Sequence, residues 1–129
     1  MIRVLIVDDM QEIREYLRDI IAEYAADIQV AGFASSGREA VEAALRDRPD
    51  VVLMDVQMET RTACVTAIAA IHKAAPEIRC IVLTIHENDE YLFQAYQSGA
   101  SDYIIKTMEP QAIVAAIRDV YENELLLRP

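Results

Sequence analysis

The stretch "VLIVDDM", residues 4–10, joins a short apolar run to two adjacent carboxylates, Asp8 and Asp9. An apolar run of this length without polar alternation is typical of a strand that is buried on both faces of a sheet. Comparable runs are "VVLM" (51–54) and "IVLT" (81–84), with weaker candidates in "IQVAGFA" (28–34) and "DYIIK" (102–106). The sequence therefore predicts five strands, and the first of them ends on negative charge.

The segments between these strands have the residue spacing of amphipathic helices. Their apolar residues recur three or four positions apart, at Ile13, Tyr16, Leu17, Ile20, Ile21 and Tyr24, at Ala40, Val41, Ala44 and Leu45, at Ile68 and Ile71, and at Ile113, Ile117, Val120 and Tyr121. Ser36 with Glu39 has the spacing of a capping box, and Asp9 with Glu12 has an acidic version of it. Single residues that suit helix boundaries are Gly99, at the end of the fourth helix, and Pro110, in the first turn of the last.

Strand and helix alternate five times, and this order predicts the architecture. Strands that are separated by helices pair in parallel through right-handed crossovers, which places helices on both faces of the sheet. We therefore expect an α/β fold with a (βα)5 doubly wound parallel sheet. In such a sheet ligands bind at the carboxyl ends of the strands, beside the point where the strand order reverses.

The composition limits the possible classes of function. The chain has 129 residues, 53% of them apolar, which suits one domain with a buried core. A formal net charge of -10 argues against direct binding to a nucleic acid backbone and favours a docked protein or a metal ion. Cys64 and Cys80 form no C-x-x-C pair, and no apolar run has the length of a signal-peptide core or a membrane span. We expect a cytoplasmic protein that does not bind membranes.

Five polar residues fall where the predicted strands end or just beyond. They are Asp8 and Asp9 after the first strand, Asp55 at the end of the third, Thr84 at the end of the fourth and Lys106 at the end of the fifth. Three carboxylates repel one another, and a hard divalent cation that prefers oxygen ligands, such as Mg²⁺, would relieve the repulsion. A carboxylate beside Mg²⁺, with a hydroxyl and an ammonium nearby, suits the handling of phosphate. One carboxylate can act as the nucleophile and form an aspartyl phosphate.

Three longer stretches resemble the response-regulator receiver domains of two-component signalling. They are "VLIVDDMQEIREYL" (4–17), "VVLMDVQM" (51–58) and "IVLTIHENDEYLFQAYQSGASDYIIK" (81–106). The resemblance implies a flavodoxin-like fold with the strand order 2-1-3-4-5. The last stretch is most similar to the LuxR-type (NarL/LuxR) subfamily, whose members attach a helix-turn-helix DNA-binding domain after the receiver.

The resemblance also implies a metal site. In receivers of this pattern, Asp9 and Asp55 would bind Mg²⁺ directly, together with the backbone carbonyl of Gln57. Asp8 would bind the ion through a water molecule.

Further roles follow from the same resemblance. Asp55 would be the phospho-acceptor and would take its phosphoryl group from a sensor histidine kinase. Thr84 and Lys106 would hold the phosphoryl group after transfer. Tyr103 would be the aromatic switch residue, which turns inward as Thr84 moves. The chain would act as a phosphoryl acceptor with slow autodephosphorylation, which is not the activity of a conventional enzyme.

The resemblance further predicts the domain organisation. Residues 1–123 would form the receiver, and residues 124–129 would begin a linker to a C-terminal helix-turn-helix output domain that this chain lacks. DNA would be contacted only through that output domain, to control transcription. Phosphorylation is expected to change an output surface, and a homodimer is one possible result.

The sequence departs from the receiver pattern at three places. Glu59 stands where receivers commonly have a proline, and Ala63 stands where they have a glycine. Thr107 follows the lysine in place of a proline on a cis bond, so we expect a trans bond there. Gln57 and His86 occupy two positions that tune the dephosphorylation rate in this family, and they predict no lifetime by themselves.

Two other functions remain open at this point. A degenerate receiver, acting as a phosphorylation-independent protein-binding module, is compatible with the altered loop at 59–63. A flavodoxin-like electron carrier shares the architecture, but it needs a loop rich in Ser, Thr and Gly after the first strand. The chain has the acidic "DDMQEIR" (8–14) at that place, which argues against the electron carrier.

Overall fold

The computed structural model describes the whole chain except residues 59, 61, 86–89 and 128–129, and it describes side chains through residue 122. The strands are β1 (Ile2–Val7), β2 (Ile28–Ala34), β3 (Val51–Asp55), β4 (Arg79–Thr84) and β5 (Asp102–Ile105). The helices are α1 (Gln11–Tyr24), α2 (Gly37–Asp47), α3 (Ala63–Ala74), α4 (Glu90–Ser98) and α5 (Pro110–Leu127). All five predicted strands are present, and a helix follows each of them.

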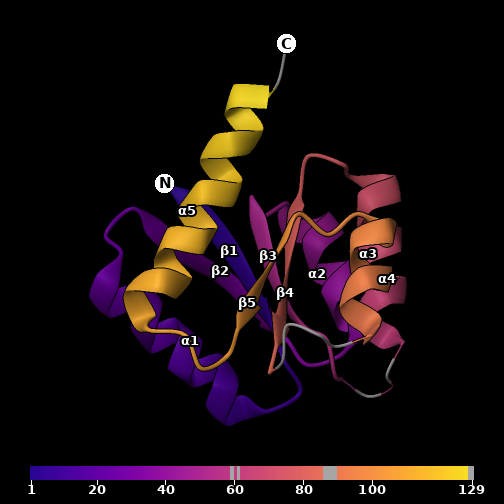
Figure 1. Cartoon of the computed structure of the whole chain (residues 1–129), viewed down its shortest axis with the longest axis horizontal. Helices are drawn as coiled ribbons and strands as arrows, with labels where there is room; N and C mark the ends of the chain where they lie inside the picture. Colours follow the sequence, from indigo (N-terminus) through magenta and orange to yellow (C-terminus); the bar gives the residue numbers. More distant parts are fainter. Residues whose placement is uncertain (59, 61, 86–89, 128–129) are drawn as a thin grey trace.

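The strands form one parallel sheet in the order β2-β1-β3-β4-β5. Helices α1 and α5 cover one face, and α2, α3 and α4 cover the other (Figure 1). The predicted fold class and strand order are therefore confirmed. The order reverses between β1 and β3, so a ligand crevice is expected where these two strands end.

The core has two halves because successive side chains of a strand point to opposite faces of the sheet. In β1, Val4 and Ile6 pack with α1 and α5, whereas Leu5 and Val7 pack with the helices of the other face. All four side chains are almost fully buried. Complete burial of one aliphatic side chain contributes about 1.5–3 kcal/mol, so the strands that carry the polar rim are anchored on both faces.

The parallel register brings the predicted site residues to one edge of the sheet. Val7 of β1 is paired with Met54 of β3, so Asp8 follows beside Asp55. Asp55 is paired with Leu83 of β4. The carboxyl ends of β1, β3 and β4 therefore meet at one edge, as the alternation of elements predicts.

The start of α1 differs from the expectation. Met10 is the N-cap residue and its side chain makes no capping bond. The Met10 N–H instead donates to Oδ1 of Asp8 at 3.0 Å. The predicted acidic capping box of Asp9 and Glu12 is therefore wrong, because the carboxylate of Asp9 belongs to a group formed with residues distant in sequence.

The capping of α2 agrees with the sequence. The hydroxyl of Ser36 accepts a hydrogen bond from the Glu39 N–H at 3.1 Å. The carboxylate of Glu39 turns back to the hydroxyl of Ser35 at 2.7 Å, rather than to Ser36 itself. The capping-box prediction is confirmed for its first bond.

Helix α4 ends at Ser98 and is followed by Gly99, which has φ of 121°. The Gly99 N–H donates to the Tyr96 carbonyl and the Ala100 N–H donates to the Ala95 carbonyl, the pattern of a Schellman motif. Pro110 begins α5, as predicted. Helix α5 continues to Leu127, so part of the expected linker at 124–129 is helical, and the domain boundary at residue 123 stays a prediction.

Two further features concern the peptide bonds and the helices. No peptide bond among the described residues is cis, so the bond before Thr107 is trans as expected. Within the described part of the chain, no helix combines the length and the apolar character that crossing a membrane requires.

Candidate functional site

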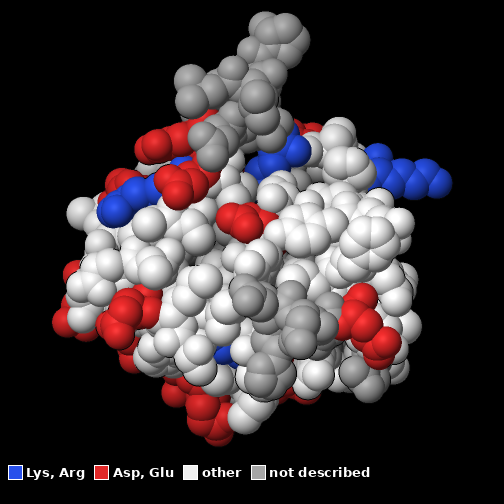
Figure 2. Space-filling view, viewed as in Figure 1, with Lys and Arg blue, Asp and Glu red and all other residues white. Residues whose placement is uncertain are grey.

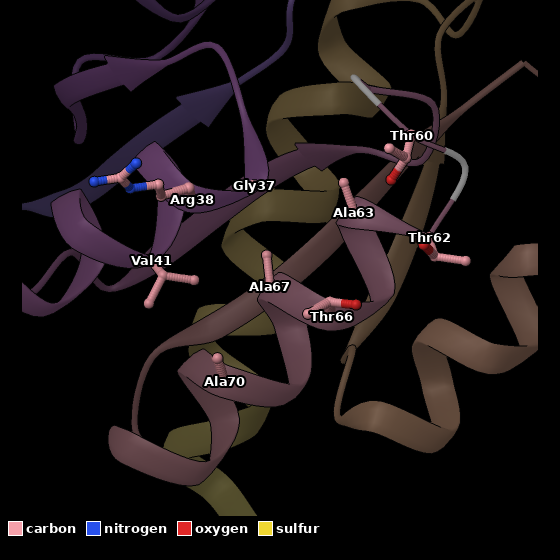
Figure 3. A pocket seen from close by; sticks show the side chains of 9 residues that line it. All are labelled: Gly37, Arg38, Val41, Thr60, Thr62, Ala63, Thr66, Ala67 and Ala70. Atoms are coloured by element: carbon pink, nitrogen blue, oxygen red, sulfur yellow. The ribbon is translucent and has the colours of Figure 1, made fainter.

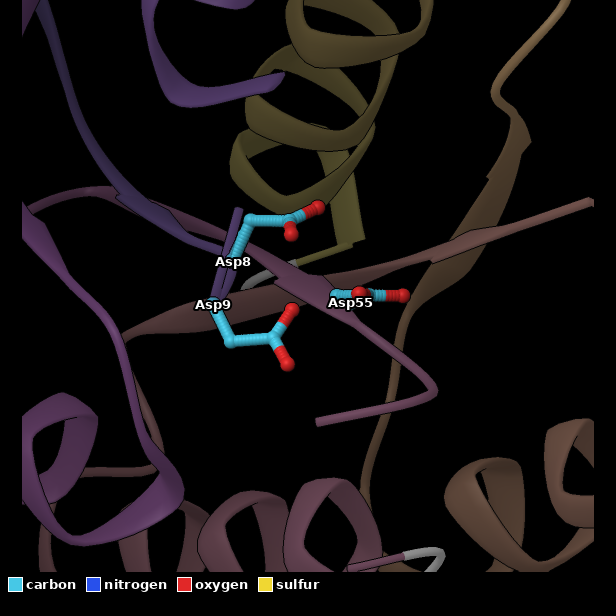
Figure 4. A group of neighbouring side chains, drawn as sticks. All are labelled: Asp8, Asp9 and Asp55. Carbon is cyan, nitrogen blue, oxygen red and sulfur yellow. The ribbon is translucent and has the colours of Figure 1, made fainter. Parts of the chain in front are cut away.

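Three carboxylates meet at the carboxyl edge of the sheet. Asp8 and Asp9 follow β1, Asp55 ends β3, and one oxygen of each carboxylate lies within 4.8 Å of the other two. In Figure 4 the side chains of Asp8 and Asp9 extend toward the side on which Asp55 lies. Asp8 is fully buried and Asp55 is 4% exposed, whereas Asp9 is exposed. The group offers oxygen ligands to a cation from one open side.

Lys106 brings a positive charge to this group. Its Nζ lies 3.1 Å from Oδ1 of Asp55 and 3.2 Å from Oδ2 of Asp8. The Lys106 N–H donates to the Thr84 carbonyl at 2.8 Å, which ties the end of β5 to the end of β4. The side chain of Thr84 is fully buried there. The structure thus brings the five predicted rim residues to one edge.

The environment of the site shifts the pKa values of Asp55 and Lys106. Burial raises the pKa of Asp55 to about 6, and the neighbouring charge of Asp8 adds to that effect. The backbone N–H of Gln57, which donates to Oδ1 of Asp55 at 3.1 Å, and the ammonium of Lys106 oppose it. Burial lowers the pKa of Lys106, but attraction to Asp55 and Asp8 outweighs burial and raises it above its ordinary value. A second positive charge would therefore be attracted to this site.

Arg14 also contacts this site, although the sequence did not predict it. Its Nη1 donates to the main-chain carbonyl of Asp8 at 2.7 Å. A main-chain carbonyl carries no sequence signal, so the only available signal was a cation in the first turn of the helix that follows the acidic pair. The predicted ligand Gln57 lies directly beyond β3, where its main chain contacts Asp55 and its side chain is exposed.

Tyr103 lies on β5, half-buried against the core half that α2, α3 and α4 cover. Its ring meets the ring of Tyr96 edge to face, with 6.4 Å between the centroids and 89° between the planes. Burial raises the pKa of Tyr96 to about 12, and the charge of Asp102, the neighbouring Tyr103 and a hydrogen bond to the Asp102 carboxylate add to this. Tyr103, the residue predicted to act as the switch, is thus in contact with Tyr96.

The surface of α4 near Tyr103 carries exposed aromatic side chains. Phe93 of α4 is 68% exposed and Tyr96 is 38% exposed. Figure 2 shows mostly uncharged surface over the α4 side of the molecule, with acidic and basic side chains at its border. A surface of this kind suits contact with another protein.

The altered loop after β3 is only partly described. Glu59 and His86, two of the positions that depart from or tune the family pattern, lie outside the described residues. Ala63, at the usual glycine position, begins α3. A Cβ on Gly37 of α2 would lie 3.0 Å from the Ala63 carbonyl oxygen, so the glycine that permits this close approach is on the facing helix.

A hollow of about 340 Å³ lies between α2 and α3 (Figure 3). Its lining consists mostly of small and hydroxyl-bearing residues, namely Gly37, Arg38, Val41, Thr60, Thr62, Ala63, Thr66, Ala67 and Ala70. None of the five rim residues lines it. The hollow is therefore separate from the acidic site.

Comparison with known families identifies this arrangement. Residues 4–118 match the response regulator receiver domain. The chain belongs to the receiver-domain family. Asp8, Asp9, Asp55, Thr84 and Lys106 all lie within the matched residues.

Sequence relatives of this receiver include regulatory proteins of other bacteria. The oxygen regulatory protein NreC of Staphylococcus epidermidis is 33% identical over 122 residues, which are 95% of this chain and 56% of the relative. The uncharacterized transcriptional regulatory protein YxjL of Bacillus subtilis is 35% identical over 127 residues, 98% of this chain and 57% of the relative. The receiver thus spans little more than half the length of these relatives. They support the predicted likeness to the LuxR-type subfamily.

Solved receivers have the same fold. The response regulator domain of Thermotoga maritima CheB superimposes with a TM-score of 0.85 at 33% identity, over 100% of this chain and 99% of that one. The signal receiver domain of the response regulator NarL from Mycobacterium tuberculosis superimposes with a TM-score of 0.86 at 26% identity, over 94% of this chain and 96% of that one. These similarities cover the whole (βα)5 unit.

Proposed function

We propose that this receiver accepts a phosphoryl group on Asp55 from a phosphohistidine of a sensor histidine kinase, with Mg²⁺ as the cofactor. One observation carries the proposal: the Lys106 ammonium lies 3.1 Å from Asp55 inside a group of three carboxylates. An ammonium next to a carboxylate can neutralise a phosphoryl group that becomes attached to it. The same ammonium lies within reach of Asp8, so it is held at the site before any phosphoryl group arrives.

The residues present fit a divalent cation. Three carboxylates face one ammonium, so negative charge is in excess when all three are ionised. Burial and then the charge of Asp8 raise the pKa of Asp55, so a further positive charge would stabilise its ionised form. Asp8, Asp9 and Asp55, with the backbone carbonyl of Gln57, would hold Mg²⁺, and the Asp8 contact would run through water. Bound there, the ion would offset negative charge on the carboxylates and on the incoming phosphoryl oxygens.

The transfer itself is a displacement at phosphorus. A carboxylate oxygen of Asp55 forms a bond to phosphorus while the phosphorus–nitrogen bond of the phosphohistidine breaks, and the histidine nitrogen keeps the electron pair. Lys106 then contacts phosphoryl oxygens instead of the free carboxylates. The Thr84 hydroxyl donates a hydrogen bond to a further phosphoryl oxygen. Slow attack by water would release inorganic phosphate and restore Asp55.

The new charge would favour one arrangement of the site and of Tyr103 over another. As Thr84 moves toward the phosphoryl group, Tyr103 would turn inward and change the surface that α4 and β5 present. A C-terminal helix-turn-helix domain would respond to this change, directly or through a homodimer, and regulate transcription in the cytoplasm. Gln57 and His86 would tune the lifetime of the phosphorylated state.

Intact-mass measurement tests the proposal. The protein is incubated with Mg²⁺ and acetyl phosphate beside Asp55→Asn and a matched control, Asp19→Asn, which changes an exposed carboxylate of α1. We expect the parent and the Asp19→Asn variant to gain the mass of one phosphoryl group and Asp55→Asn to gain none. The decay of the added mass measures the rate of autodephosphorylation.

Absence of phosphorylation in the parent protein would decide against the proposal. A folded parent that gains no mass with acetyl phosphate or with a phosphorylated kinase domain would contradict phosphoryl acceptance. The degenerate receiver, which acts as a binding module, would then be the better description.

A further inference from the structure

Arg14 lies outside the carboxylate group but contacts it through the main chain. It occupies the first turn of α1, is half-buried, and donates from Nη1 to the Asp8 carbonyl at 2.7 Å. The hydroxyl and the N–H of Ser35 lower the pKa of Glu39, and the charge of Arg14 adds to this effect. The guanidinium therefore lies at the end of β1, and its charge also acts on Glu39 of α2.

Asp8 is held at each of its polar groups. Its N–H donates to the Ala34 carbonyl at 3.1 Å, and its Oδ1 accepts from the Met10 N–H at 3.0 Å. Its Oδ2 accepts from Nζ of Lys106 at 3.2 Å. The Asp8 carbonyl lies beyond the end of β1, and Arg14 supplies its donor. Because Asp8 is fully buried, loss of that donor would leave a polar group without compensation unless the peptide turned.

The position of the Asp9 side chain depends on the peptide that joins Asp8 to Asp9. This exposed side chain makes no hydrogen bond or ion pair with any residue that the structure describes, so among these residues only the backbone restricts the region that its carboxylate can reach. The Asp8 carbonyl belongs to the planar unit that joins Asp8 to Asp9. A hydrogen bond that fixes the direction of this carbonyl also fixes where the Asp9 side chain begins.

We infer that Arg14 is a positioning residue for the cation site. By holding the Asp8 carbonyl, it orients the Asp8–Asp9 peptide so that both carboxylates face Asp55 before a cation binds. This inference rests on the proposed function, since it assigns Arg14 to the same Mg²⁺ site. Partners that orient metal ligands commonly change metal affinity roughly ten- to a hundredfold when they are removed.

Simple electrostatics predicts the opposite sign. A guanidinium near a cation site repels Mg²⁺, so removing the positive charge alone would strengthen binding. Removing the hydrogen bond that orients the peptide would weaken it. The direction of the change therefore separates the two roles of Arg14.

Mg²⁺ titration by calorimetry on the full chain measures this direction. We expect Arg14→Ala to bind Mg²⁺ roughly tenfold more weakly than the parent. Arg14→Lys, which keeps a cationic donor, should recover part of the loss, and Arg14→Gln should not. Arg18→Ala is the matched control, because Arg18 is on the same helix and pairs at the surface with Asp19 at 3.1 Å. It should bind Mg²⁺ as the parent does.

Urea unfolding in EDTA provides the second readout. A merely structural role would lower the free energy of unfolding of Arg14→Ala and leave the Mg²⁺ affinity unchanged. Unchanged or tighter Mg²⁺ binding by folded Arg14→Ala therefore overturns the inference. Should that variant fail to fold, Arg14→Gln decides by the same criterion.

Asp9→Asn separates this inference from the proposed function. If the parent binds Mg²⁺ and Asp9→Asn binds it more weakly, the site stands and the Arg14 variants alone decide the inference. A parent that binds no Mg²⁺ overturns both.

Discussion

The carboxyl edge of the sheet and the α4–β5 segment are held together by different forces. At the edge, buried Asp8 and Asp55 share the ammonium of Lys106. In the α4–β5 segment, the half-exposed ring of Tyr96 meets Tyr103 edge to face. A buried charge that loses its partner costs far more than a ring contact at the surface. The edge is therefore suited to fixed chemistry, and the segment is suited to rearrangement.

The largest expected effect comes from removing the shared cation at the edge. Lys106→Ala removes the ammonium that two buried carboxylates share, so we expect the free energy of unfolding in EDTA at pH 8 to fall by roughly 3 kcal/mol. Urea unfolding measures the loss. Lys73→Ala is the matched control, because Lys73 is the other lysine of the chain and is exposed on α3. Equal losses in the two variants would contradict the proposed importance of the shared ammonium.

Mg²⁺ should reverse part of the Lys106→Ala effect. A ligand that binds only the native state stabilises it in proportion to the logarithm of its concentration over its dissociation constant. The variant lacks the competing ammonium, so Mg²⁺ should stabilise it more than it stabilises the parent. A smaller stabilisation of the variant would argue against a cation site formed by these carboxylates.

The α4–β5 segment is most sensitive at its glycine. Gly99 has φ of 121°, and a Cβ there would lie 2.5 Å from Cγ of His72. We expect Gly99→Ala to lower the free energy of unfolding by roughly 2 kcal/mol, because it adds backbone strain and a clash. His72→Ala removes the contacts with Cγ and Nδ1 but keeps the Cβ of residue 72, which would lie 2.8 Å from the new Cβ, so the double variant should recover only part of the loss. No recovery would show that the backbone conformation and the remaining Cβ contact, rather than the imidazole ring, cause the loss.

Much of the fold and site was predictable because parallel strands end at one edge. Asp8, Asp55 and Thr84 mark strand ends in the sequence, and the register brings those ends together. Asp9 was wrongly assigned to a cap, since a local pattern does not reveal a distant Asp55. Arg14 was missed because its partner is a main-chain carbonyl. Sequence patterns thus locate strand ends better than they locate contacts to the main chain.

A smaller effect at the edge concerns the pH dependence of stability. Burial raises the pKa of Asp55 from 3.8 to about 6, so the native state binds a proton more tightly than the unfolded state does. The stabilisation from this proton is fully present below the unfolded pKa and is lost as the pH rises through about 6. We therefore expect Asp55→Asn in EDTA to be more stable than the parent at pH 8, by roughly 1 kcal/mol.

The free energies of unfolding of the parent and of Asp55→Asn should converge at low pH. Near pH 4 the parent carries a protonated Asp55 and should differ little from Asp55→Asn. Unfolding curves from pH 4 to 8 measure this, and Asp19→Asn serves as the control with an exposed carboxylate. A parent whose stability relative to Asp55→Asn rises between pH 4 and 6 would show that attraction to Lys106 outweighs burial at Asp55.

The smallest effect is expected from the ring pair of the α4–β5 segment. An edge-to-face aromatic contact contributes roughly 0.5–1.5 kcal/mol beyond burial, and the exposure of Tyr96 favours the lower end. A double-mutant cycle with Tyr96→Leu and Tyr103→Leu isolates this coupling from the loss of each side chain. Tyr96→Phe keeps the ring contact but loses the hydrogen bond to Asp102. It therefore tests the hydroxyl separately. A coupling as large as the Lys106 effect would mean that the segment is as firmly held as the edge, and it would remove the physical basis for assigning the rearrangement to Tyr103.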